Sequence, residues 1–346
     1  MNYKSPLFFF YFLTLGSAPC LFLSCKPSLS SKNAAGSEKV KSEAKDSSDS
    51  TLLKQFDYAS LQTDLTKHSI PLDSVFDGGP GKNGIPAIDF PEFISSQQAA
   101  HTLSQIEYGI YLEGKTESKF YPFNILNWHE IINDRLDGHP IAVTFCPLCG
   151  SAIIYDRVID SDTLSFGVSG KLYESNLLMF DDKTETLWSQ GLGEAVIGTL
   201  TGKKLKLLNS SVISFDDVLN NNPGAKVLSV NTGFDRDYSR YPYVQYMNND
   251  SLMFPISKTD NRYFKNKDEI YVVPVGNSSV AFAWKALLKS GKAEVKTSAG
   301  SILVKVENNV PLAVRKETGE PLAGYFSFWF SWYALHPNDI VWKGNK

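Results

Sequence analysis

The sequence predicts a strand-rich α+β fold made of two similar halves, and three observations lead to that prediction. Short apolar runs alternate with turn signals over most of the chain, which is typical of many short strands. A unit of strand, turn, strand and short helix occurs twice, about 160 residues apart. The length of 346 residues is enough for about two domains, each with its own core.

In the first half, residues 76–90 are dense in Gly and Pro, which predicts a loop. Residues 110–112 and 119–121 then predict two strands joined by a turn. Pro122 starts a short helix, because Phe123, Ile125, Leu126 and Trp128 have helical spacing. After a turn at Asp137-Gly138, the β-branched run 141–145 predicts a strand that leads into Cys146.

The second half repeats this order. Residues 270–273 and 280–282 predict strands, 284–288 a helix and 302–306 a further strand. Residues 215–219 with Pro223 correspond in the same way to residues 332–335 with Pro337. We therefore assign 51–230 to the first half, 231–267 to a connecting loop and 268–346 to the second half. Chance matches within a β-rich protein are the alternative to a duplication.

Between the halves, residues 164–193 predict further strands. Residues 181–185 are expected to form a hairpin turn, and Gly167 and Gly170 to lie at bulges or turns. Met179 is expected in the core, with a soft copper ligand as the alternative.

The N-terminus predicts a bacterial lipoprotein leader over residues 1–25. Lys4 supplies the positive charge, the apolar run 7–15 is too short to cross a bilayer, and residues 21–24 precede Cys25 as a loose lipobox. Lipid on Cys25 would attach the chain to a membrane of the cell envelope. Residues 26–50 have almost nothing to bury, which predicts a disordered tether. A plain signal peptide or an uncleaved anchor is the alternative.

The charge balance excludes one class of partner. The formal net charge is -3, so no basic excess exists for phosphate neutralisation and we expect no nucleic-acid binding. Motifs that cradle phosphates or dinucleotides are absent from the sequence, and we expect no nucleotide cofactor. The identity of a protein or small-molecule partner stays open.

Residues 146–150, Cys-Pro-Leu-Cys-Gly, are the main candidate site. A strand on each side of the motif is typical of a metal-binding knuckle, whereas a thioredoxin-like motif continues into a helix. A knuckle supplies only half of a tetrahedral shell, so we predict a zinc or copper site formed by Cys146, Cys149, His129 and His336. His139, His68 and His101 are expected in loops.

Other functions stay open at this point. A closed shell would make the metal structural, and an open position would permit catalysis with Glu130 as a possible proton acceptor. Without a metal, Cys146 and Cys149 could cycle as a thiol–disulfide pair or be inert thiols. A third possibility is a carbohydrate or peptide binder that uses the aromatic run 326–333 and residues 241–246, with a structural disulfide.

Several ordered motifs resemble the bacterial and archaeal family called domain of unknown function 3179. They are residues 84–89, 125–134, 144–152, 166–170, 187–190 and the closing 328–332 with His336-Pro337. The similarity spans about residues 76–342 and implies that seven residues fall on family motif positions: Trp128, His129, Glu130, Cys146, Cys149, Trp188 and His336. Asp182 stands where a basic residue is expected and Phe145 where Tyr is common.

Overall fold

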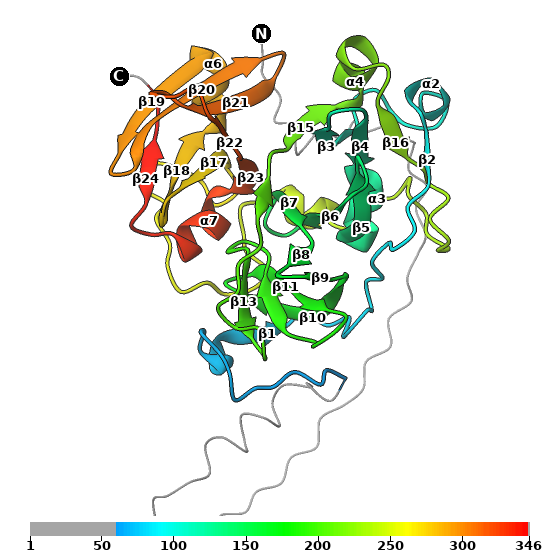
Figure 1. Cartoon of the computed structure of the whole chain (residues 1–346), viewed down its shortest axis with the longest axis vertical. Coiled ribbons are helices and arrows are strands. Elements are labelled where there is room, and N and C mark those ends of the chain that lie inside the picture. The colour runs from blue at the N-terminus through cyan, green and yellow to red at the C-terminus, as the bar shows by residue number, and fades with distance from the viewer. Residues whose placement is uncertain (1–59, 345–346) are drawn as a thin grey trace, which may run out of the picture. The chain divides into compact units, whose positions relative to one another are not determined.

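Backbone hydrogen bonds confirm the strand-rich α+β class (Figure 1). The computed structural model describes residues 60–344, all of which belong to one compact unit. The leader, the tether, Cys20 and Cys25 lie outside the described residues.

One eight-stranded sheet carries the cysteine motif and combines strands from both halves. Its order is β24 (Ile340–Trp342), β18 (Ser278–Ala283), β17 (Glu269–Val275), β23 (Tyr325–Phe328), β7 (Ser151–Asp156), β6 (His139–Cys146) and β5 (Ile131–Leu136), with β14 (Leu207–Leu208) also on β7. Within this sheet the two halves meet where Phe326 on β23 pairs with Ala152 on β7. The strands that flank the cysteine motif are therefore continuous with the second half.

Two other sheets belong mostly to the first half. The order β15 (Ser211–Ser214), β3 (Tyr108–Glu113), β4 (Ser118–Pro122), β16 (Lys226–Leu228) and β2 (Phe93–Ser95) forms one of them. The other has β1 (Val75–Asp77), β10 (Phe166–Tyr173), β11 (Asn176–Asp181), β12 (Leu187–Ser189) and β13 (Glu194–Ile197). A short hairpin, β8 (Val158–Ile159) with β9 (Asp162–Thr163), lies between β7 and β10 in the chain.

The second half adds a four-stranded sheet, β19 (Lys292–Thr297), β20 (Gly300–Glu307), β21 (Val310–Arg315) and β22 (Pro321–Leu322). Two strand arrangements have the same order of pairing. In one, β15, β3, β4 and β16 are neighbours, and in the other β23, β17, β18 and β24 are. In both, the last pair is parallel and the others are antiparallel.

The helices are short. They are the 3₁₀ turn η1 (Leu72–Ser74), α2 (Ser96–Ala99), α3 (Phe123–His129), α4 (Phe215–Asn221), α5 (Val244–Met247), α6 (Trp284–Ser290) and α7 (Trp329–Leu335). The predicted helices at 122–128 and 284–288 are confirmed as α3 and α6. Apart from α5, residues 229–268 have no helix or strand, in agreement with the predicted connecting loop.

The hairpin turn predicted at 181–185 joins β11 to β12, and Gly170 lies at a register shift in β10 with φ 76°. Strand β5 was not predicted, because its sequence Ile-Ile-Asn-Asp-Arg-Leu lacks apolar alternation. Two of its polar residues are buried with specific partners: Asn133 pairs with the backbone of Phe166, and Asp134 with Lys119 and Tyr121. Tertiary hydrogen bonds therefore override the pattern.

The aromatic run near the C-terminus lies in the core. Phe326, Phe328, Trp329, Phe330 and Trp332 are each at most 2% exposed and belong to the largest apolar cluster, together with both cysteines. These side chains consequently present no face to a carbohydrate or peptide.

Glu107 links the loop before β3 to the start of α3. Its Oε1 accepts the amide of Asn124 at 3.0 Å. Burial raises the pKa of this carboxyl from 4.5 to about 7, and the amide hydrogen bond only partly opposes that shift. The folded chain therefore holds a proton here that the unfolded chain releases above pH 4.5.

This proton predicts a pH-dependent stability. As the pH rises from about 4.5 to 7, the Glu107 contribution to the free energy of unfolding should fall by about 3 kcal/mol and then stay constant. E107Q keeps the hydrogen-bond acceptor and should lose this part of the dependence. Urea unfolding of both proteins at pH 5 and pH 8 measures the difference. The same pH dependence in wild type and variant would contradict the assignment.

Candidate functional site

The Cys-Pro-Leu-Cys-Gly turn brings its two sulfurs into contact. Cys146 ends β6, and the turn closes where Cys146 pairs with Ser151 on β7. The Cys146 thiol donates a hydrogen bond to the Cys149 sulfur, and the two Sγ atoms are 3.0 Å apart. Cys146 is 2% exposed and Cys149 is completely buried. Both are free thiols in this structure.

Three elements far apart in the sequence hold the turn. The Phe328 amide of β23 donates to the Cys149 carbonyl at 2.8 Å. The Cys149 thiol donates to the Ser175 carbonyl at 3.0 Å, in the turn between β10 and β11. The Tyr246 hydroxyl of α5 donates to the Leu148 carbonyl at 2.8 Å. Both halves and the connecting loop therefore enclose the sulfurs.

The Cys146 sulfur has a mixed electrostatic environment. Burial is the main reason that the pKa of the Cys146 thiol lies well above its usual value, and the adjacent Cys149 thiol raises it further. The backbone amides of Leu177 and Cys149 donate toward the Cys146 sulfur and oppose this shift. These backbone amides favour a negative charge on the Cys146 sulfur.

Glu130 is the titratable carboxyl next to Cys146. It follows α3 with φ 58°, a left-handed conformation that non-glycine residues adopt rarely. The side chain is 7% exposed. Burial, and secondarily the Cys146 charge, raises the pKa of Glu130 well above its usual value.

His129 is buried behind the turn with both ring nitrogens occupied. Its Nδ1 donates to the Pro86 carbonyl at 2.8 Å, because a carbonyl can only accept. Nε2 then accepts from the Tyr238 hydroxyl at 2.7 Å. Burial lowers the pKa of His129, which favours this neutral form. A metal ion at Nε2 would have to displace Tyr238.

His336 follows α7, and its Nδ1 lies 3.4 Å from the Asp339 carboxylate. Its ring is stacked on Trp332 with a centroid distance of 5.9 Å, and burial lowers the pKa of the imidazole. Within residues 60–344, three or more His, Cys, Asp or Glu side chains nowhere gather in a metal-binding arrangement. The structure thus brings Cys146 and Cys149 together and does not bring His129 and His336 to them.

A buried polar network under the turn was missed by the sequence analysis. The Gln190 amide oxygen accepts from Ser151 Oγ at 2.7 Å and from Asn176 Nδ2 at 3.0 Å. Its Nε2 donates to Thr144 Oγ1 and to the Ser151 carbonyl, both at 3.1 Å. These hydrogen bonds tie β6, β7 and the strands after β10 together. The only sequence signal is the presence of these residues in polar positions of otherwise apolar strands.

The two tryptophans at family motif positions and the two residues that depart from the family pattern each contact another residue of the fold. Trp188 Nε1 donates to Asp181 at 3.0 Å, and Trp128 Nε1 donates to the Arg240 carbonyl at 3.1 Å. At the two departures from the family pattern, Phe145 stacks on Phe123 with a centroid distance of 4.2 Å, and the Asp182 carboxylate accepts the Ser165 amide at 2.8 Å.

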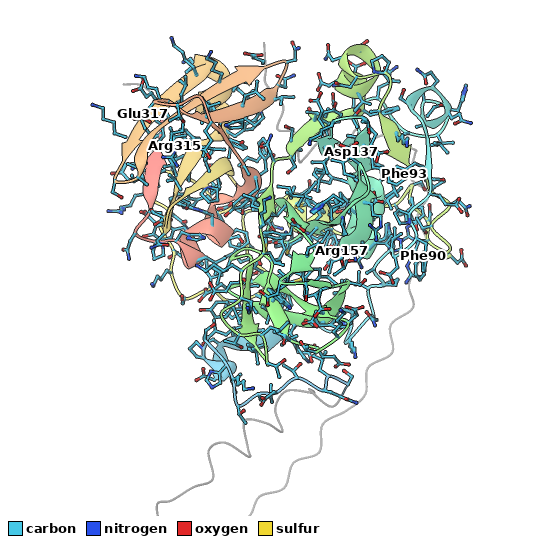
Figure 2. All side chains as sticks on the ribbon, in the orientation of Figure 1. Phe90, Phe93, Asp137, Arg157, Arg315 and Glu317 are labelled. Atoms are coloured by element: carbon cyan, nitrogen blue, oxygen red, sulfur yellow. The ribbon has the colours of Figure 1, made fainter. Side chains whose placement is uncertain are left out.

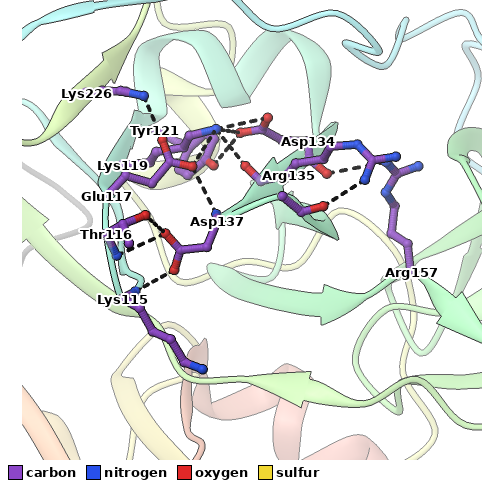
Figure 3. Close-up of polar contacts among 11 residues, drawn as sticks. Lys115, Thr116, Glu117, Lys119, Tyr121, Asp134, Arg135, Asp137, Arg157 and Lys226 are labelled. Carbon is purple, nitrogen blue, oxygen red and sulfur yellow. Dashed lines mark hydrogen bonds and ion pairs between the residues drawn. The ribbon is translucent and has the colours of Figure 1, made fainter.

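A second group of buried charges lies along β4 and β5 (Figure 3). Lys119 Nζ donates to the Asp134 carboxylate at 2.9 Å and to the Arg135 carbonyl at 2.6 Å. Tyr121 also donates to Asp134, and Arg157 donates to the Asp134 carbonyl at 3.3 Å. This network pairs its charges internally and fixes β5 next to the cysteine hairpin.

A surface cavity of about 380 Å³ lies between the 83–89 loop, the start of β10 and the end of β11. Asp89, Asp182, Phe180 and Phe234 line it, and neither cysteine does. Phe90, which follows Asp89, is 90% exposed (Figure 2). The cavity is therefore separate from the dithiol.

Gly150 fits its position because a side chain would not. Its φ is 56°, and a Cβ atom there would lie 2.6 Å from the Phe328 ring. Gly138, with φ 79°, has nothing within 4 Å of such an atom. Both glycines have a positive φ, but only Gly150 lies against another side chain. A comparison of alanine substitutions at the two positions therefore distinguishes the conformational cost from the cost of the contact with Phe328.

We predict that G150A lowers the free energy of unfolding by about 3 kcal/mol, from overpacking and the left-handed conformation together. G138A should cost only about 1 kcal/mol, because its penalty is conformational alone. Urea unfolding of the reduced proteins measures both values. Equal losses would show that Phe328 does not confine the turn.

Within residues 60–344, no helix combines the length and the apolar composition needed to cross a membrane. Comparison with the curated proteins and with the solved structures gives no match. The model of the family described as "Protein of unknown function (DUF3179)" matches residues 82–318, which is more than half of the chain and includes the cysteine turn. The chain therefore belongs to the DUF3179 family.

Proposed function

We propose that this chain is a thiol–disulfide protein of the bacterial cell envelope, anchored by lipid on Cys25, in which Cys146 and Cys149 cycle between dithiol and disulfide. The observation that carries the proposal is the contact between the two sulfurs at 3.0 Å, without a further ligand group gathered around them in residues 60–344. An oxidising compartment is where such a pair would be used.

The geometry favours a sulfur–sulfur bond over a shared metal. A disulfide requires the sulfurs to approach to about 2.05 Å, a movement of roughly 1 Å. Two thiolates on one tetrahedral zinc at about 2.3 Å would instead have to separate to about 3.8 Å and find two more ligands. The hydrogen bonds from Phe328 and Tyr246 to the turn oppose such an expansion.

Binding of zinc or copper by Cys146, Cys149, His129 and His336 is the competing proposal. Amide donors to the Cys146 sulfur are compatible with it, since they would also stabilise a metal thiolate. It requires both imidazoles to leave their present partners and converge on the turn. The experiment below distinguishes the two proposals.

We also infer that the two halves arose by duplication and that only the first half retained or acquired the chemistry. The equal pairing order of β15, β3, β4, β16 and of β23, β17, β18, β24 supports this. Strands β6 and β20 correspond to each other in the two halves. Strand β6 leads into the cysteine turn, whereas β20 leads into the turn at Asn308 and Asn309. The second half has no sulfur at that position.

We predict that the peptide containing Cys146 and Cys149 carries two thiols in the reduced full-length protein and one internal disulfide after oxidation. Thiol labelling under denaturing conditions, followed by peptide mass mapping, measures this separately from Cys20 and Cys25. Because the closed loop is short, oxidation should raise the free energy of unfolding by at most about 2 kcal/mol.

Metal analysis of the same protein, with H129A and H336A as controls, tests the alternative. The thiol–disulfide proposal predicts substoichiometric zinc and copper and unchanged disulfide formation in both variants, while C149S abolishes the disulfide. Stoichiometric metal that is lost in H129A and in H336A would refute the proposal in favour of the metal site.

A further inference from the structure

The whole cysteine turn is closed to large partners. Every residue from Cys146 to Gly150 is buried, the two sulfurs most of all. Tyr246 covers the Leu148 carbonyl, and the Phe328 ring lies against Gly150. A protein disulfide must approach an attacking sulfur along the line of its own S–S bond, and this enclosure leaves no path for a polypeptide.

The same enclosure also selects among small oxidants. A low-molecular-weight disulfide would form a mixed disulfide, which requires space for a complete second thiol next to Cys146. A hydroperoxide adds only one oxygen atom to a sulfur and forms a sulfenic acid. Of these two routes, only oxidation by a hydroperoxide has an intermediate, the sulfenic acid, that is almost as small as the thiol itself.

One buried polar group beside the dithiol has no hydrogen-bond partner within residues 60–344. It is the completely buried hydroxyl of Ser175, the residue whose carbonyl accepts the Cys149 thiol. The Glu130 carboxyl lies within electrostatic range of Cys146. Buried polar groups normally have partners, so the Ser175 hydroxyl indicates a small polar molecule that visits this site.

We propose that a small hydroperoxide, with hydrogen peroxide as the simplest case, oxidises the dithiol. This rests on the proposed function. Cys146, whose sulfur receives two amide hydrogen bonds, attacks one peroxide oxygen: the O–O bond breaks, a Cys146 S–O bond forms, and the thiol proton leaves with the other oxygen as water. Cys149 then attacks the Cys146 sulfur, the S–O bond breaks, and a second water leaves as the disulfide forms. Two thiols and one peroxide thus give one disulfide and two waters.

The test compares oxidants on the reduced full-length protein. We expect hydrogen peroxide to close the disulfide at least about a hundredfold faster than glutathione disulfide at equal concentration, because the site excludes the bulkier reagent. In C149S, hydrogen peroxide should add one oxygen atom to Cys146, visible by peptide mass. Equal rates for both oxidants, or a C149S protein whose Cys146 gains no oxygen, would overturn the inference.

S175A tests the unpaired hydroxyl as a positioning group. Loss of one hydrogen bond to the reacting oxygen should slow oxidation by hydrogen peroxide about tenfold. The two proteins should react equally in denaturing urea, where the site no longer exists. A variant that reacts as fast as the wild type in the folded state would remove Ser175 from the mechanism and count against a peroxide site.

A further measurement tests the proposed thiol–disulfide function independently of the peroxide. Prolonged equilibration with oxidised dithiothreitol in mild urea, where local opening exposes the sulfurs, should form the same disulfide regardless of the natural oxidant. Disulfide formation there, with no reaction with hydrogen peroxide in the native protein, would refute the peroxide and retain the thiol–disulfide pair. Absence of the disulfide under both conditions would refute both.

Discussion

The hydrogen bond from the Phe328 amide to the Cys149 carbonyl is the interaction on which the site depends most. Within the turn, the one backbone hydrogen bond of its own runs from the Cys149 amide to the Cys146 carbonyl at 3.1 Å. The β23 edge and the Phe328 ring supply the rest of its confinement, and Gly150 permits their close approach. A hairpin of the first half is thus confined by a strand of the second half, within the sheet that both halves share.

The enclosure determines the chemistry in two opposite ways. It keeps the sulfurs 3.0 Å apart and buries them, and burial raises the pKa of Cys146 and so disfavours its thiolate. At the same time, amides at the Cys146 sulfur and the nearby Glu130 provide local compensation that an apolar core would lack. Inert structural thiols do not need such polar neighbours, and this contrast is the basis for treating the turn as a working dithiol.

Local sequence patterns predicted what depends on neighbours in the chain: the hairpins, α3 and α6, the bulge at Gly170 and the cysteine turn itself. They failed for β5, whose Asn133 and Asp134 are buried because of partners on other strands. The residues that surround the cysteine turn could not be predicted for the same reason, because they are far from it in the sequence. Ser175, Tyr246 and Phe328 reach the turn from 26 to 179 residues away, and no spacing rule connects them to Cys149. His129 and His336 were predicted as ligands because the folded part has no further cysteine and because of their places in the chain, and neither reason carries information on their hydrogen-bond partners.

The central claim is that Cys146 and Cys149 form a reversible redox pair. An equilibrium titration of the full-length protein tests it most directly, in mild urea that permits local opening and in buffers of reduced and oxidised dithiothreitol, with the fraction of disulfide in the 146–149 peptide as the readout. The account predicts a single two-electron transition that is the same from the oxidising and the reducing direction. A pair that stays as two thiols at every ratio, with a bound metal that protects it, would contradict the account.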